Sequence, residues 1–165
     1  MITMEKFATR IDLPESARDK ICVLLNEQLT DSFDLYSHVK QAHWNVKGQE
    51  FYQLHKLFDE LAGELVEHLD VIAERVTALG GTVLGTVRMA ARASRLPEYT
   101  ADIVDGMTSV KALAIRYASL CETTRLGIDR AEQERDMATV DLLSDVSRDL
   151  DKALWFLEAH VQDKP

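Results

Sequence analysis

Several features that define common protein classes are scarce or absent in this chain. Only two of its 165 residues are cysteine, Cys22 and Cys121, and they show no CxxC spacing. Both lie in helical apolar patterns, so buried free thiols are expected rather than a disulfide or a zinc site. No apolar run approaches the roughly 18 residues of a membrane span, and the N-terminus has no signal-peptide pattern. These absences predict a soluble cytoplasmic protein.

Positive charge is also in short supply. The chain has 19 lysine and arginine residues against 28 aspartate and glutamate residues, a formal net charge of −9. General affinity for nucleic acid or anionic membranes depends on an excess of basic side chains, so neither is expected. An acidic surface instead attracts cations.

The few prolines and glycines divide the chain into helical segments. Pro14 suits the first turn of a helix and Gly48 suits its end, with a period near 3.6 between them up to about Asn45. A second helix is predicted from Gln49 to Leu79, before two glycines. Its length of ~45 Å, from ~1.5 Å per residue, is unusual for a globular protein and typical of a long bundle.

The second half of the chain predicts two more long helices after a long connection. Residues 81–100 form a crossover in which we expect a short helix over 87–93. Helices follow at about 101–130 and 138–160, and the charged residues 129–136 are expected to form a turn or frayed end. Four amphipathic helices with one long crossover between the second and third predict an all-α, ferritin-like four-helix bundle. No strand-like alternation competes with this interpretation.

We expect one domain over residues 14–160, with a short tail at 1–13 and another at 161–165. The chain is long enough for one substantial core. Charges within its first twenty positions balance, and the closing VQDKP is not rich in lysine. Neither end therefore supplies a basic tail.

The second predicted helix carries two pairs of metal-competent side chains. His55/Asp59 and Asp70/Glu74 are each spaced i, i+4, so the members of a pair stack on one helix face. At ~100° per residue, all four fall within an arc of about 100°. His43 precedes them, across a glycine turn. Imidazole and carboxylate together suit iron, manganese or zinc, although surface salt bridging also explains each pair taken alone.

The two pairs are too far apart to bind one ion. They are separated by ~15 residues, or ~22 Å at ~1.5 Å per residue. One centre can include both pairs only if a second copy of the helix lies antiparallel across a two-fold axis near Glu64 and Leu65, which generates two equivalent sites. The face between the pairs carries small residues that allow close approach, Ala62, Gly63 and Val66, and Ala73 lies further along the helix.

The other faces of this helix have different compositions. One carries an apolar stripe that is expected to face the core: Leu54, Phe58, Leu61, Leu65, Leu69, Ile72, Val76 and Leu79. Another is charged and is expected to be solvated: Lys56, Glu60, Glu64, Glu67 and Arg75. Di-iron sites within one bundle use Glu-x-x-His motifs, and this chain has none. Any iron site is therefore expected at a subunit interface.

Four stretches carry a family resemblance: KQAHWNVKG, LHKLFDEL, EHLDVIAERVTALGG and VLGT. They closely resemble the Dps family, the DNA-binding proteins from starved cells, which are miniature ferritins. The resemblance implies a ferroxidase site with two histidines and an aspartate from one subunit, here His43, His55 and Asp59. It also implies an aspartate and a glutamate from the two-fold partner, which match Asp70 and Glu74.

The resemblance implies a function as well. It implies a hollow dodecamer that oxidises Fe(II), preferably with hydrogen peroxide, stores Fe(III) as a mineral and protects against oxidative stress. Trp44 matches the family's site tryptophan, with ordinary packing as the alternative. Asp136, Asp141 and Asp145 resemble the carboxylates that line the pores through which iron enters, with a solvated helix start as the alternative.

Two further expectations follow. His38, His68 and His160 match no ligand position, so we expect them to have surface or packing roles. The chain also departs from family members that compact DNA through a lysine-rich tail. We therefore expect little or no DNA binding; the alternative is a nucleoid-associated, DNA-compacting protein in which iron binding is secondary.

Overall fold

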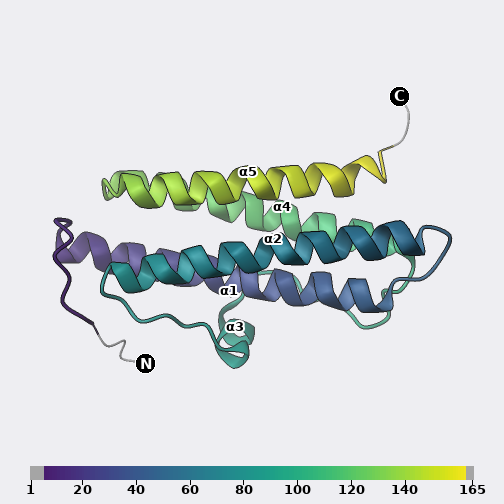
Figure 1. The fold of residues 1–165 in the computed structure, drawn as a ribbon, viewed down its shortest axis with the longest axis horizontal. Coiled ribbons are helices and arrows are strands. Elements are labelled where there is room, and N and C mark those ends of the chain that lie inside the picture. Colours follow the sequence, from purple (N-terminus) through teal and green to yellow (C-terminus); the bar gives the residue numbers. More distant parts are fainter. Residues whose placement is uncertain (1–5, 163–165) are drawn as a thin grey trace.

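The chain forms a bundle of helices. The computed structural model describes residues 6–162, and within them five helices follow one another: α1 (Glu15–Asn45), α2 (Phe51–Ala78), α3 (Val87–Ala93), α4 (Gly106–Gln133) and α5 (Met137–Ala159). The four long helices lie side by side, and α3 lies in the crossover on one flank (Figure 1). No strand occurs within the described residues. The predicted all-α, ferritin-like bundle and its short helix over 87–93 are confirmed.

The long helices pack as two antiparallel pairs. α1 lies along α2 and α4 along α5, and the pairs meet through α1 against α4 and α2 against α5. Within each pair a short connection reverses the chain. Residues 79–105 instead run back along the bundle, so that α4 begins at the end where α2 began (Figure 1). The crossover thus lets α4 run in the same direction as α2.

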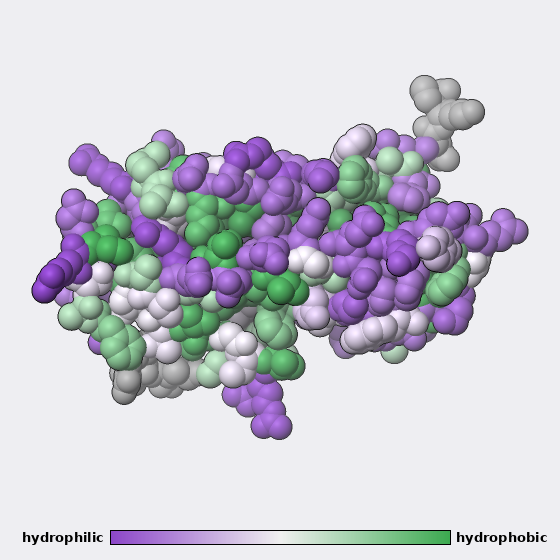
Figure 2. Space-filling model, in the orientation of Figure 1, coloured by the Kyte–Doolittle hydropathy of each residue, from purple (hydrophilic) through white to green (hydrophobic). Residues whose placement is uncertain are grey.

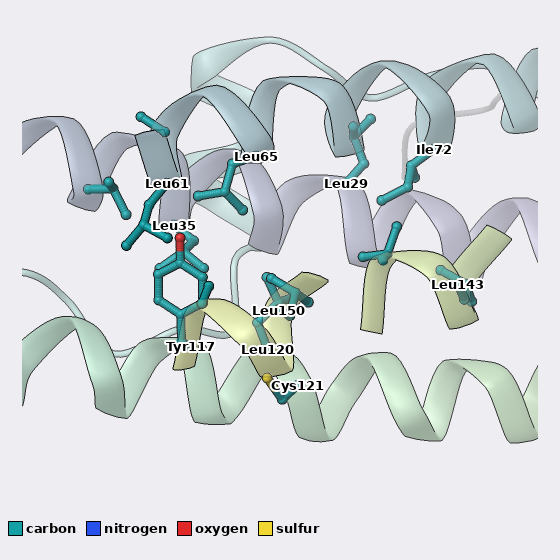
Figure 3. Close-up of a cluster of buried hydrophobic side chains, with 14 of the residues drawn as sticks. Leu29, Leu35, Leu61, Leu65, Ile72, Tyr117, Leu120, Cys121, Leu143 and Leu150 are labelled. Atoms are coloured by element: carbon teal, nitrogen blue, oxygen red, sulfur yellow. The ribbon is translucent and has the colours of Figure 1, made fainter. Parts of the chain in front are cut away.

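Apolar side chains from all four long helices fill the core. Its middle contains large buried residues (Figure 3): Leu35, Leu61, Leu65, Tyr117, Leu120 and Leu150. Each fully buried leucine contributes about 1.5–3 kcal/mol. The apolar stripe predicted for α2 is buried, apart from the partly buried Leu69. The predicted free thiols of Cys22 and Cys121 are confirmed, and burial raises the pKa of the Cys121 thiol to about 12.

The other faces of α2 differ in part from the prediction. Arg75 was predicted to be solvated, but its guanidinium pairs at 2.6 Å with the buried carboxylate of Asp136. On the face with small residues, Gly63 and Val66 are exposed, whereas Ala62 is buried in the protomer's own core. The strip left open to a second helix is therefore narrower than the helical spacing indicated.

Both ends of α4 lie further along the chain than predicted. The helix begins at Gly106, five residues late, because the Asp105 carboxylate accepts a hydrogen bond from the Thr108 backbone N–H at 2.9 Å and caps it there. At its other end the helix continues through most of the charged segment 129–136. The turn is confined to residues 134–136, where Arg135 has a φ of 59°.

The tails are described only in part. Residues 1–5 and 163–165 lie outside the described residues. The rest of the N-terminal tail lies against the bundle, where the Phe7 backbone N–H donates to the Gly80 carbonyl at 2.9 Å. None of the described helices is long and apolar enough to span a bilayer.

Candidate metal centre

Two histidines lie against each other where the chain turns from α1 into α2. His43 is in the last turn of α1, and His55 is in the second turn of α2. Between them the chain reverses through residues 46–50, where Gly48 has a φ of +118° that only glycine adopts readily. The reversal stacks the two imidazole rings, with centroids 3.9 Å apart and 19° between the planes.

Hydrogen bonds orient both rings. The Nδ1–H of His43 donates to the carbonyl of His55 at 2.8 Å, and the Nδ1–H of His55 donates to the carbonyl of His43 at 2.9 Å. A carbonyl oxygen only accepts, so each Nδ1 must carry the proton. When either ring is neutral, its lone pair is therefore on Nε2. A backbone hydrogen bond to the other nitrogen is the usual way in which a metal-binding histidine is oriented.

The third predicted ligand lies beside this pair. Asp59 is one turn after His55 on α2, and its Oδ1 is 3.8 Å from the Nε2 of His43. That distance is too long for a hydrogen bond, but two donor atoms that share one ion lie roughly 3–4 Å apart when each is ~2.1 Å from it. The Asp59 side chain is 58% exposed. His43 is therefore adjacent to both His55 and Asp59.

Lys40 is a charged neighbour that the sequence motifs did not indicate. Its Nζ donates to Asp59 Oδ1 at 2.9 Å. The hydrogen bond and charge of Lys40 hold the pKa of Asp59 below its ordinary value. Lys40 precedes His43 by three residues and Trp44 by four, so helical spacing was the signal that could have placed it on their shared face.

Asp70 and Glu74 lie on the same helix but in its other half. Both are exposed, and within residues 6–162 no side chain is paired with either carboxylate. They stay ~22 Å along α2 from the first pair, at ~1.5 Å per residue. No group of three or more His, Cys, Asp or Glu side chains in the described part of the chain is close enough to hold a metal ion by itself.

An apolar groove adjoins Asp70. Its volume is about 410 Å³, and it lies between α1, α2 and the crossover, lined among others by Phe33, Val66, Ala73 and Val83. Figure 2 shows apolar side chains gathered on this half of the face, whereas the half that holds the start of α2 is mostly polar. The two halves of α2 thus present different surfaces.

Trp44 points outward next to His43. It is 64% exposed, so it does not serve as a packing residue within its own protomer. The Nζ of Lys40 lies 5.5 Å from the centre of its ring, within the range of a cation–π contact. Phe51 and Tyr52, at the start of α2, are also exposed. Exposed aromatic residues therefore lie close in sequence to both histidines, and the centre of the Phe51 ring lies 5.3 Å from that of His55.

The three predicted pore carboxylates have unequal surroundings. Asp136 is 2% exposed, caps α5 through the Thr139 backbone N–H and pairs with Arg75. Burial by itself would raise the pKa of Asp136, but the hydrogen bonds from Arg75 and Thr139 outweigh it and hold that pKa below its ordinary value. Asp141 and Asp145 are exposed, and Asp145 pairs with Arg148. Only these last two face outward.

The remaining histidines have other partners. His38 pairs with Asp34 at 3.2 Å, and His68 pairs with Asp149 at 3.1 Å; both rings are buried. His160 is exposed and donates from Nδ1 to a carbonyl one turn before it. These surroundings fit the packing and surface roles expected for them.

Comparisons with known proteins agree on the family. The ferritin-like domain family matches residues 22–164. A relative named DNA protection during starvation protein, from Agrobacterium fabrum, is 42% identical over 98% of this chain and 99% of its own. Among similar solved structures, DpsC from Streptomyces coelicolor has a TM-score of 0.93 and 30% identity, covering 100% of this chain and 98% of that one.

A second solved structure adds a chemical description. The Dps protein from Vibrio cholerae O1, described as a member of a broad superfamily of ferritin-like diiron-carboxylate proteins, has a TM-score of 0.88 and 29% identity. It covers 94% of this chain, and 98% of its own chain is matched. With a ferritin-like domain over residues 22–164 and a match to Dps proteins over nearly its full length, this chain belongs to the Dps family of ferritin-like proteins.

Proposed function

We propose that this protein oxidises Fe(II), preferably with hydrogen peroxide, at sites between two-fold-related subunits, and stores Fe(III) as a mineral inside a hollow dodecamer. The observation that carries the proposal is the histidine pair: two stacked rings, each held at Nδ1 by a backbone carbonyl, which leaves Nε2 to bind a metal ion beside Asp59. Nitrogen and carboxylate donors in this mixture suit Fe(II). The diiron-carboxylate description of the Vibrio relative supports the same chemistry.

The complement of this half-site is expected from a second copy. An antiparallel α2 across a two-fold axis near Glu64 would bring the partner's Asp70 and Glu74 to His43. The same operation would bring the exposed Trp44 of one copy to the apolar groove beside Asp70 of the other. Aromatic side chains that fill apolar pockets are typical anchors of an interface. The exposed Gly63 leaves room for the approach, because even an added methyl group there would meet nothing within 4 Å.

Each group has a role in the oxidation. The two histidines and Asp59 bind Fe(II) as substrate, and the partner's carboxylates complete the site. Hard carboxylate oxygens favour the ferric product over Fe(II). Two Fe(II) ions at neighbouring positions give one electron each to hydrogen peroxide, which takes up two protons and leaves as two water molecules. Because both electrons are delivered together, no hydroxyl radical is released.

The test uses complementation between two inactive variants. His43→Ala and Asp70→Ala are each expected to abolish Fe(II)-dependent peroxide consumption after anaerobic loading. When the two are co-assembled at equal amounts, half the two-fold pairs are mixed, and each mixed pair has one intact site. About a quarter of the parent activity should return. If both ligand groups served one protomer alone, nothing would return.

A matched control separates complementation from other effects of mixing. His43→Ala and His55→Ala remove ligands from the same half-site, so co-assembly of these two should restore no activity. Recovery in this control, or none with Asp70→Ala, contradicts the proposed division of ligands. A particle near twelve times 18.6 kDa is expected for every variant.

We further propose that Asp141 and Asp145 line the pore through which iron enters, with Asp136 holding the start of their helix.

Nucleoid compaction is the second candidate function, because relatives are named DNA protection during starvation protein. We propose that DNA binding by this chain is weak. Its net charge is −9, and Lys6 of the N-terminal tail is already paired with Asp19 at 2.6 Å. Phosphate contacts dominate non-specific DNA binding and need free basic groups. A gel-shift at low salt tests this, and a retained complex there would favour compaction.

A further inference from the structure

Lys40 makes two contacts that link Asp59 to Trp44. Its ammonium donates to Asp59 Oδ1 at 2.9 Å and lies 5.5 Å from the centre of the Trp44 ring. The stem is well packed, since the side chain is only 18% exposed, whereas Asp59 is 58% exposed. One positive group therefore lies between a predicted ligand and an aromatic ring in the protomer.

A metal ion and this ammonium compete for the same oxygen. Asp59 Oδ1 also faces the Nε2 of His43 at 3.8 Å, so an ion shared by those two atoms would sit close to the Lys40 ammonium. Two cations that share one carboxylate oxygen repel each other. A divalent ion with several ligands displaces a single ammonium.

We infer that Lys40 is a placeholder cation that occupies Asp59 until metal arrives and then moves away, which changes the surroundings of Trp44. The inference rests on the proposed function, because it takes Asp59 and His43 as ligands. It assigns Lys40 two effects: it lowers the affinity of the site for metal, and it makes Trp44 emission report occupancy. Lys40 acts through Asp59 and is a positioning residue.

The experiment uses the assembled full-length protein and Zn²⁺, which binds nitrogen and oxygen ligands and has no redox chemistry. The chain has two tryptophans, so Trp155→Phe leaves Trp44 as the reporter; Trp155 is exposed and distant in sequence from the site. In that background, Zn²⁺ affinity is measured by calorimetry and Trp44 emission is followed in the same titration. Lys40→Met removes the charge, and Lys40→Arg keeps it.

Removal of the Lys40 charge should increase the affinity for Zn²⁺ and abolish the change in Trp44 emission on Zn²⁺ binding. Lys40→Met is expected to bind Zn²⁺ at least roughly threefold more tightly than the parent, in line with the loss of a competing, partly exposed ion pair. Its Trp44 emission should not change on Zn²⁺ addition, whereas the emission of the parent and of Lys40→Arg should. Lys56→Met is the matched control, because Lys56 lies 5.9 Å from the Tyr52 ring and contacts no predicted ligand.

Each other result has a distinct meaning. If Lys40→Met binds Zn²⁺ no more tightly than the parent, or if its Trp44 emission still responds, Lys40 is not a placeholder. A gain in affinity for Lys56→Met equal to that of Lys40→Met also overturns the inference, because the effect would be one of general charge. If His43→Ala and Asp59→Asn leave Zn²⁺ binding unchanged, the proposed site itself is wrong.

Discussion

Both ends of α2 carry a pair of polar residues, but the two pairs have different surroundings in the protomer. At the first end, His55 and Asp59 are engaged with the stacked ring of His43 and with Lys40. At the second end, Asp70 and Glu74 are exposed, and their carboxylates are unpaired within the described residues. If Asp70 and Glu74 complete a site on another subunit, as proposed, they need no partner within their own chain. This difference between a paired and an unpaired end is expected if the site is divided between two subunits.

The second end is nevertheless held firmly. Arg75, next to Glu74, pairs with the buried carboxylate of Asp136 and donates to the hydroxyl of Thr139 at 3.1 Å. Asp136 also caps α5. The contact fastens the end of α2 to the start of α5. The carboxylates of Asp70 and Glu74 are thus unpaired side chains on a backbone that is held in place. The following predictions test this contrast between the two ends of α2.

The largest effect is expected for the contact that fixes the second end. Asp136→Ala leaves the Arg75 guanidinium without its buried partner and removes a helix cap, which should lower the free energy of unfolding by about 3–5 kcal/mol. Denaturation with guanidinium chloride at a fixed protomer concentration measures this loss in the free energy of unfolding. Asp141→Ala, at an exposed position of the same helix, should stay within about 0.5 kcal/mol of the parent. A loss below about 1 kcal/mol for Asp136→Ala would show that the second end is not held there.

Ligand variants should separate activity from stability. Asp59→Ala and Asp70→Ala are each expected to slow Fe(II)-dependent peroxide consumption by at least about 100-fold, since even residues that merely orient a metal ligand change function by up to that amount. Asp70→Ala should leave the stability of the protomer unchanged, because no side chain in residues 6–162 pairs with its carboxylate. Stopped-flow kinetics and denaturation together check this. Full activity in Asp70→Ala would show that the second end of α2 supplies no ligand.

Acid should weaken the contact between Arg75 and Asp136 at the second end of α2 more than the contacts at its first end. The pKa of Asp136 is held below its ordinary value, so its stabilising effect is present above the unfolded-state pKa of about 3.9 and is lost as pH falls through the lower folded-state pKa. The same sign applies to Asp59, but that carboxylate is exposed and contributes little. Thermal unfolding between neutral pH and pH ~3 should therefore be less pH-dependent in Asp136→Asn than in the parent, and almost unaltered in Asp59→Asn.

The smallest effect is expected outside α2. Asp141→Asn combined with Asp145→Asn should slow the appearance of Fe(III) only a few-fold at low ionic strength, because these exposed carboxylates would attract Fe(II) from a distance rather than bind it. The difference should shrink as salt is added. Glu122→Gln combined with Glu158→Gln, both at exposed positions, is the control for the loss of two charges. Equal slowing in that control would argue against a pore at Asp141.

Much of this arrangement could be predicted from the spacing of residues. The periodic apolar residues of α2, the i, i+4 pairs and the long crossover are local properties, and the structure has them as predicted. The start of α4 was misplaced because its cap depends on the single side chain of Asp105. Arg75 was misassigned because its partner, Asp136, lies 61 residues further along the chain.

What the sequence by itself determined is therefore the set of helices, the face on which each candidate ligand lies and the distance between the two pairs, because helical geometry follows from local bonding. Only the tertiary structure decided that the rings of His43 and His55 stack and orient each other, that Lys40 occupies Asp59, and that Ala62 is buried. Those contacts join residues from different helices. Their existence depends on how the helices pack, and no periodicity within one helix encodes that.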